Sequence, residues 1–161
     1  LKGAPIGQTL QIIMGLVTVS MCVAIFIVGR KSPRYSSVAK VGIIPSLFNI
    51  GEPIIYGLPV VLNPFMLIPY VFASAITGTF YYWLQLIHAM PAVAITVPWT
   101  TPAFLNTFLA SGGHILPVVV QAICFVFDVL MFIPFVKLAV RAEIQKTDKK
   151  GNQSVNTESV E

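Results

Sequence analysis

Charged residues are scarce in this sequence of 161 residues, since Asp, Glu, Lys and Arg make up only 10% of it, against about 25% in soluble domains. Between Lys40 and Asp128 the single one is Glu52. A soluble domain does not normally leave so long a stretch almost uncharged, and 56% of the residues are hydrophobic. The composition therefore predicts an integral membrane protein, with room for only a few spans of about 20 residues each.

Residues that bind metals or act as nucleophiles are also few. Cys22 and Cys124 both lie in apolar stretches, and we expect two buried thiols rather than a disulfide or a metal pair. His88 and His114 have no partner at metal-ligand spacing, so a structural place near the span ends is favoured. Because the sequence has no Gly-Lys-Ser/Thr phosphate loop, use of ATP by this chain alone is not expected. No metal and no cofactor are predicted.

Three apolar stretches are long enough to cross a membrane, at residues 6–28, 65–84 and 115–138. The cations gather beside them, at Arg30–Lys40 and Lys137–Lys150. By the positive-inside rule both basic stretches lie in the cytoplasm, and residue 1 lies outside. Arg30–Ser37 is rich in turn residues and is predicted to be a cytoplasmic loop. The formal net charge of +4 is therefore assigned to membrane topology rather than to nucleic-acid binding.

Prolines and glycines interrupt two further apolar stretches, Val38–Asn63 and Ile87–Gly113. For the first we expect two half-helices around an extended tip near Asn49–Pro53, and for the second a re-entrant or irregular segment. Broken backbone at membrane depth is tolerated only where it is buried in protein or lines a cavity. The predicted fold is thus an all-α integral membrane protein, with about three full transmembrane helices plus two re-entrant or broken helical segments.

Three features outside the broken segments carry expectations of their own. Tyr81–Trp83 ends the second span and suits the membrane–water boundary. Asp128 is favoured as a structural acid with a partner on another helix, although intramembrane acids are often functional. Gln8 and Gln11 share one helix face, where hydrogen bonds between helices are favoured over contact with a sugar.

The chain becomes polar and mixed in charge from Ala142 onward, with almost no large apolar residue. Segments of this composition cannot bury enough apolar surface to fold alone. We therefore divide the chain into a membrane portion at residues 1–145 and a disordered cytoplasmic tail at residues 146–161.

Glu52 is the residue around which the sequence is organised. A charged side chain at the bilayer centre costs about 2.5–3.5 kcal/mol on insertion scales, and such residues mark substrate or ion pathways. Asn49 lies three residues earlier, and the turn at Gly51 and Pro53 lets both side chains face one pocket. Further neutral hydrogen-bonding groups follow in the two broken segments: Tyr56, Asn63, Thr100 and Thr101.

Trp99 adds a flat apolar face between two prolines of the second broken segment. One carboxylate, several neutral polar groups and an aromatic ring suit a polyhydroxylated ligand such as a sugar. An inorganic cation would require several carboxylates or carbonyls instead. The candidate substrate-binding residues are Asn49, Glu52, Trp99 and Thr100.

The stretch from Phe48 to Pro64 resembles the membrane-spanning IIC component of bacterial sugar phosphotransferase systems, within the lactose, cellobiose and N,N'-diacetylchitobiose family. The resemblance rests on Asn-Ile-Gly-Glu-Pro at Asn49–Pro53, Gly-Leu-Pro at Gly57–Pro59 and Leu-Asn-Pro at Leu62–Pro64. It extends over most of residues 1–145, which it identifies as the C-terminal, substrate-binding portion of a permease.

The resemblance implies group translocation of a disaccharide in a multi-pass protein of the bacterial cell membrane. The permease would present the 6-hydroxyl of the sugar to a phosphocysteine on a separate IIB protein or domain. Glu52 is then the catalytic residue near that hydroxyl, Asn49 a sugar contact and Trp99 a stacking residue. A homodimer, assembled largely through an N-terminal half that also carries a site histidine and is not in this chain, is implied as well.

Two other classes of function stay open from the residues alone. The first is a proton- or ion-coupled secondary sugar transporter, with Glu52 or Asp128 as the relay. The second is a purely structural membrane subunit. The presence of a IIB partner would favour the phosphotransferase hypothesis over the secondary transporter. Binding of a ligand by the full-length protein would favour either of these over the structural subunit.

Overall fold

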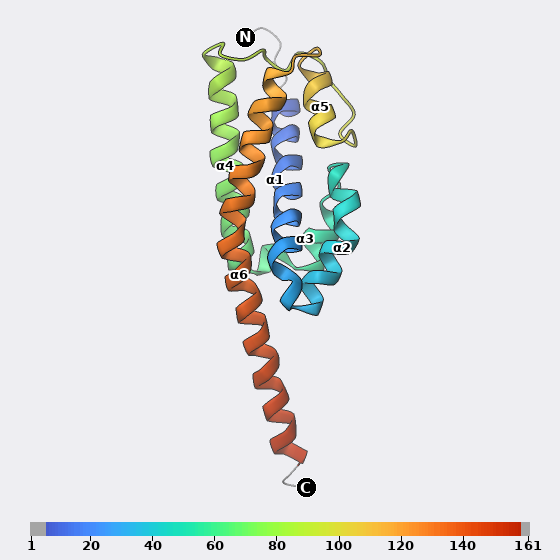
Figure 1. Cartoon of the computed structure of the whole chain (residues 1–161), viewed down its shortest axis with the longest axis vertical. Helices are drawn as coiled ribbons and strands as arrows, with labels where there is room; N and C mark the ends of the chain where they lie inside the picture. Colours follow the sequence, from blue (N-terminus) through green and yellow to red (C-terminus); the bar gives the residue numbers. More distant parts are fainter. Residues whose placement is uncertain (1–5, 159–161) are drawn as a thin grey trace.

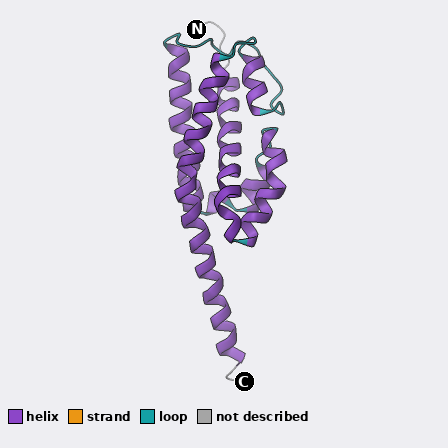
Figure 2. Ribbon diagram, viewed as in Figure 1, coloured by secondary structure: helices purple, strands orange, loops and turns teal. Residues whose placement is uncertain are grey.

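The computed structural model describes residues 6–158, and the side chains of residues 7–30 and 32–145. Over the described residues the chain is helical and forms no strand (Figure 2). Three long helices lie side by side (Figure 1): α1 (Ile6–Val28), α4 (Pro64–Leu86) and α6 (Leu116–Glu158). Their apolar parts are long enough to cross a membrane, at Gly7–Val28, Pro64–Leu86 and Leu116–Gln145. The three predicted spans are confirmed.

Helix α1 is the central one of the three. The share of its apolar window buried inside the protein is 67%, against 28% for α4 and 33% for α6. It packs against α6, α4 and both broken segments. Large apolar side chains such as Phe72 on α4 and Ile123 on α6 are exposed instead. The outer faces of α4 and α6 are therefore surfaces for lipid or for further protein.

The first broken segment forms a hairpin, with α2 (Pro33–Leu47) and the short α3 (Glu52–Gly57) on either side of a turn. Figure 1 shows this hairpin beside the C-terminal end of α1, at the end of the bundle from which α6 projects. Both helices carry Pro in their first turn, where its missing N–H is not needed. The two half-helices are confirmed, but the tip is a turn rather than an extended stretch, because Asn49 has a φ angle of 62° and α3 already begins at Glu52. The basic stretch from Arg30 was expected to be a loop, but after the single turn η1 (Gly29–Lys31) it is helical from Pro33 onward.

The second broken segment lies at the opposite end of the bundle (Figure 1). Residues 87–102 contain no helix, and α5 (Ala103–Ala110) follows as two turns. Gly112 and Gly113 then adopt positive φ angles of 73° and 86°, which lets the chain reverse into α6. The prediction of an irregular segment is confirmed.

One aromatic of the expected interfacial cluster lies elsewhere. Tyr81 is 1% exposed, whereas Tyr82 and Trp83 are exposed. The buried positions of α4 recur every three to four residues, and Tyr81 continues that series: Met66, Pro69, Ala73, Thr77, Tyr81 and Gln85. Helical periodicity therefore turns Tyr81 toward the bundle and leaves its two neighbours exposed, while their place at the membrane boundary stays a prediction.

The expected tail is described differently by the structure. Helix α6 continues without a break to Glu158 and projects beyond the bundle (Figure 1). Extending an existing helix adds one hydrogen bond per residue without a new nucleation cost, and Ala142, Glu143 and Gln145 are good helix formers. The composition that suggested disorder is thus compatible with a helix as far as Glu158, and residues 159–161 of the expected tail lie outside the described part of the chain.

Candidate functional site

The tips of the two broken segments meet in the structure. The amide nitrogen Nδ2 of Asn49 donates hydrogen bonds to the backbone oxygens of Trp99 and Thr101, both at 2.9 Å. Trp99 and Thr101 lie 50 and 52 positions after Asn49 in the sequence. The contact brings the Asn-Ile-Gly-Glu-Pro turn next to the loop that carries Trp99, as the sequence predicted for a shared pocket.

A cavity of about 490 Å³ opens beside the joined tips. Its size is within the range of small-molecule sites, about 300–1,000 Å³. Three of the four predicted site residues line it, namely Asn49, Glu52 and Trp99. The remaining wall comes mainly from α1, α3 and α4, whose polar contributions are Gln11, Thr18, Tyr56 and Tyr70.

Glu52 supplies the negative charge of this cavity. It is the first residue of α3, and its side chain is exposed to the cavity. No Lys, Arg or His is among the lining residues. The preceding Gly51 lies against α1, since a Cβ added there would be 2.6 Å from Cγ2 of Thr18. The close approach of the turn to α1 therefore presents the carboxylate to the cavity without a neutralising partner in its wall.

Two predicted site residues differ in their placement. Trp99 is 53% exposed and lines the cavity, so its ring is available to a ligand. Thr100 is exposed but is not among the lining residues, and its contact with a sugar stays a prediction.

Gln11 lines the cavity, although the sequence favoured hydrogen bonds between helices for it. The side chain of Gln8 forms the expected bonds between segments, donating to Oδ1 of Asn106 at 2.9 Å and accepting from the Val97 N–H at 3.3 Å. Gln11 lies on the same helix face but lines the cavity, and its buried Nε2 has no hydrogen-bond partner in the structure. An unpaired amide donor within the wall of the cavity is suited to a ligand hydroxyl.

Comparison with known proteins identifies the family. A family model described as "Phosphotransferase system, EIIC" matches residues 2–74. The crystal structure of the transporter ChbC, the IIC component from the N,N'-diacetylchitobiose-specific phosphotransferase system, superposes on 87% of this chain with a TM-score of 0.79 and 29% sequence identity. The chain belongs to the EIIC family of the phosphotransferase system. As an EIIC chain it is an integral membrane protein, in agreement with its three apolar helices.

Relatives of this EIIC chain are named for several sugars. The galactose-specific EIIC component of Lactococcus lactis subsp. cremoris is 42% identical over 72% of the chain. The cellobiose-specific EIIC component of Lactococcus lactis subsp. lactis is 33% identical over 81% of it. The lactose-specific EIICB component of Staphylococcus haemolyticus is 30% identical over 80% of it.

The chain spans only part of these relatives, covering 26%, 26% and 22% of their respective lengths. It likewise covers 33% of the ChbC chain.

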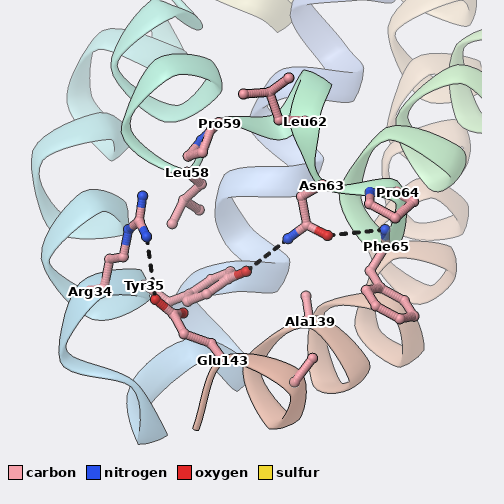
Figure 3. Close-up of a pocket in the computed structure, with 11 residues that line it drawn as sticks. Arg34, Tyr35, Leu58, Pro59, Leu62, Asn63, Pro64, Phe65, Ala139 and Glu143 are labelled. Atoms are coloured by element: carbon pink, nitrogen blue, oxygen red, sulfur yellow. Dashed lines mark hydrogen bonds and ion pairs between the residues drawn. The ribbon is translucent and has the colours of Figure 1, made fainter. Parts of the chain in front are cut away.

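The second half of the family motif lies at a different cavity of the EIIC chain, near the basic end of the bundle (Figure 3). Asn63 accepts a hydrogen bond from the Phe65 N–H at 3.1 Å and so caps α4, while its Nδ2 donates to the Tyr35 hydroxyl at 3.3 Å. Asn63, a neutral polar candidate by sequence, therefore lies outside the Glu52 cavity and joins the hairpin to α4.

An ion pair borders the same second cavity. Arg34 Nη1 lies 3.6 Å from Glu143 Oε1, which connects α2 to α6 (Figure 3). Burial of Tyr35 and, secondarily, the negative charge of Glu143 raise the pKa of the Tyr35 phenol above its usual value. Tyr35 is thus neutral at ordinary pH and can accept the bond from Asn63.

Asp128 has the structural environment that the sequence favoured. It is fully buried on α6, and its Oδ1 accepts a hydrogen bond from the Thr77 hydroxyl of α4 at 2.6 Å. The predicted partner on another helix is confirmed. Asp128 is not among the residues that line the Glu52 cavity.

Proposed function

We propose that this EIIC chain forms the sugar-binding portion of a permease that carries a disaccharide inward for phosphorylation by the phosphotransferase system. The observation that carries the proposal is the cavity in which Glu52, Gln11 and Trp99 come together at the meeting point of two broken segments. A disaccharide is favoured because relatives are named for cellobiose, lactose and N,N'-diacetylchitobiose.

The lining residues divide the tasks of sugar recognition by their chemistry. Glu52 accepts hydrogen bonds from sugar hydroxyls, and Gln11 donates one from its unpaired amide. Trp99 offers its exposed ring to the apolar face of a pyranose. Because the wall contains one carboxylate and no cation, it suits a neutral ligand with many hydroxyls better than an ionic one.

Glu52 has a second task in the transfer step. The 6-hydroxyl oxygen attacks the phosphorus of a phosphocysteine on the IIB partner, and the sulfur–phosphorus bond breaks to leave a thiolate. The hydroxyl proton passes to the Glu52 carboxylate, which acts as the general base. The product is the 6-phosphorylated sugar. The task of the chain is thus to hold the neutral sugar with its 6-hydroxyl oriented toward the phosphocysteine.

Uptake by the intact protein tests this proposal through Glu52→Gln. Gln keeps the size and one acceptor but loses the charge, and hydrogen bonds to charged groups contribute roughly 1.5–3 kcal/mol. Sugar binding should therefore fall about tenfold to a hundredfold. Phosphorylation should fall at least as far, because the base is lost as well. Glu143→Gln, at the other cavity, is the matched control and should bind sugar normally.

The source of energy is measured in the same assay. Uptake should require the phosphoryl donor and continue when a protonophore collapses the proton gradient. Sugar that accumulates unphosphorylated and only while the gradient is intact would contradict the proposal. Equal binding by the wild-type protein and Glu52→Gln would remove Glu52 from the site.

A further inference from the structure

We propose that Asn49 is a positioning residue. It fastens the tip of the second broken segment to the tip of the first, and it thereby fixes where Trp99 lies in the cavity. The inference rests on the proposed function only for the role of Trp99 toward the sugar. The fastening itself is a property of the protein without ligand.

The hydrogen bonds of Asn49 carry the inference. A primary amide has two N–H groups, and Asn49 directs both at backbone carbonyls, those of Trp99 and Thr101, at 2.9 Å each. Neither carbonyl belongs to a helix. A backbone polar group left without a partner at membrane depth costs several kcal/mol. The Asn49 side chain therefore replaces the partners that a helix would have given to this loop.

The backbone conformation at Asn49 selects its residue type. Its φ angle is 62°, in the left-handed region that Gly, Asn and Asp occupy more readily than other residues. Of these three, Gly has no side chain and ionised Asp has no donor. Asn is the one residue of the three that accepts this turn and also donates two hydrogen bonds.

Gly15 on α1 fixes the orientation of the amide. A Cβ at Gly15 would overlap the Oδ1 atom of Asn49 and crowd its Cγ. Oδ1 is buried there without a hydrogen-bond partner. If the amide were flipped, Oδ1 would face two carbonyl oxygens and repulsion would follow. The two carbonyls thus select the nitrogen, and the close approach of α1 restricts movement of the amide away from Trp99 and Thr101.

This geometry leaves Asn49 little capacity for direct contact with a sugar. Both donors are used within the protein, and the acceptor faces the backbone of Gly15. Its contribution to sugar binding is therefore exerted through the placement of Trp99. The effects of substitutions at Asn49 and Trp99 on sugar binding should therefore not add when both residues are changed.

The decisive measurement is the distance between the tips without sugar. Spin labels at Phe48 and Thr100, both exposed, report it by double electron–electron resonance in the intact protein, with Cys22 and Cys124 replaced by Ala. Asn49→Asp keeps the shape and the left-handed turn but replaces the donors with acceptors. It should broaden or lengthen the distance distribution. Asn63→Asp is the control, because Asp still accepts at the cap of α4 and can accept a hydrogen bond from the Tyr35 hydroxyl in place of the one that Asn63 donates. It should leave the distribution unchanged.

A second variant tests the same contact from α1. Gly15→Ala should displace the amide and broaden the distribution as Asn49→Asp does. A protein that carries both substitutions should have a distance distribution no broader than that of either single variant. If Asn49→Asp does not insert into the membrane, Gly15→Ala still decides the question. An unchanged tip distance in every inserted variant would overturn the inference.

Sugar binding then separates positioning from direct contact. Asn49→Asp should weaken sugar binding about thirtyfold, because two hydrogen bonds of ordinary strength are lost. In a Trp99→Ala background the same change should have almost no further effect. An equal loss in both backgrounds would show direct contact with the sugar and contradict the inference. If wild-type protein binds no sugar, the proposed function fails, while the ligand-free distance still tests the fastening.

Discussion

At the scale of single residues, amide side chains supply the hydrogen bonds that broken backbone lacks. Gln8 accepts from the Val97 N–H, Asn49 donates to two carbonyls of the same segment, and Gln121 donates to the Ala103 oxygen. The three amides come from α1, the hairpin tip and α6. Because lipid offers no alternative partners, such side chains decide where an irregular segment can rest.

Thr77 and Asp128 give a test of the buried acid. Thr77→Val keeps the shape of the side chain but removes the one hydrogen bond recorded for the Asp128 carboxylate. An unsatisfied buried polar group costs about 1–3 kcal/mol, more if charged, so the thermal unfolding temperature in detergent should fall. Thr79→Val, at an exposed position of the same helix, should leave that temperature nearly unchanged.

A substitution at Asp128 distinguishes a structural role of this residue from a role in proton coupling. Asp128→Asn can still accept the bond from Thr77, so the intact protein should retain most of its sugar uptake. Complete loss of uptake in an Asp128→Asn protein that inserts and folds normally would favour a relay role. Transport assays beside the unfolding curve separate the two.

At the scale of elements, the hairpin depends on close packing between α2 and α3. A Cβ at Gly42 of α2 would overlap the side chain of Ile54 on α3, which is fully buried. The two helices are short, and α3 has only six residues, so their stability depends on packing against neighbouring helices. Packing rather than helix propensity therefore holds Glu52 in place.

Gly42→Ala should consequently destabilise the hairpin. Overpacking in a core costs typically about 1–3 kcal/mol, and the Glu52 turn should move with α3. Lower sugar affinity and a lower unfolding temperature should appear together. Ile54→Val in the same protein should recover part of both losses, because it shortens the side chain that the new methyl meets.

Gly78→Ala is the matched control for that substitution. It lies within α4, and a Cβ there would meet Ile13 at 3.6 Å, an ordinary contact distance. Ala also favours the helix over Gly by up to about 1 kcal/mol. Equal destabilisation by Gly42→Ala and Gly78→Ala would show that the α2–α3 contact has no special part in stability.

At the scale of the whole molecule, the two broken segments enter the bundle from opposite ends (Figure 1). The first begins beside the basic residues, at the end where α6 emerges, and the second begins after α4 at the other end. Their tips meet between the two ends, through the Asn49 bonds. A site approached from both sides suits a transporter that must load a sugar outside and release it inside. Homodimer formation stays a prediction.

Cysteine labelling tests this topology in intact cells. Ser37 and His114 are both exposed. Ser37 lies in the first half of α2 and His114 between α5 and α6, at the ends of the bundle from which the first and the second broken segment enter (Figure 1). By the positive-inside rule a cysteine at Ser37 should resist an impermeant reagent added outside, and one at His114 should react. Permeabilised cells should label at both positions. Reaction at Ser37 from outside would reverse the assigned orientation.

The sequence by itself determined the number of spans, their bounds, the interruptions between them and the neighbourhood of Glu52. These properties depend on the free energy of transferring consecutive residues into the membrane and on the backbone conformations available at Pro and Gly. Both are determined by neighbouring residues in the sequence. The motif at Asn49–Pro53 also indicated the family before any fold was known. The expectation for Gln8 was right for the same reason, since its helix face follows from periodicity.

Only the tertiary structure decided which partner each polar side chain meets. Nothing local distinguishes Gln11 at the cavity from Gln8 on the same face, or places Asn63 at the other cavity. The periodicity that buries Tyr81 became clear only once the neighbours of α4 were known. Asn49 binds carbonyls 50 and 52 residues away, and its orientation depends on a glycine of a third segment. Such contacts are set by distances between remote segments, which packing of the bundle fixes and local residue patterns do not.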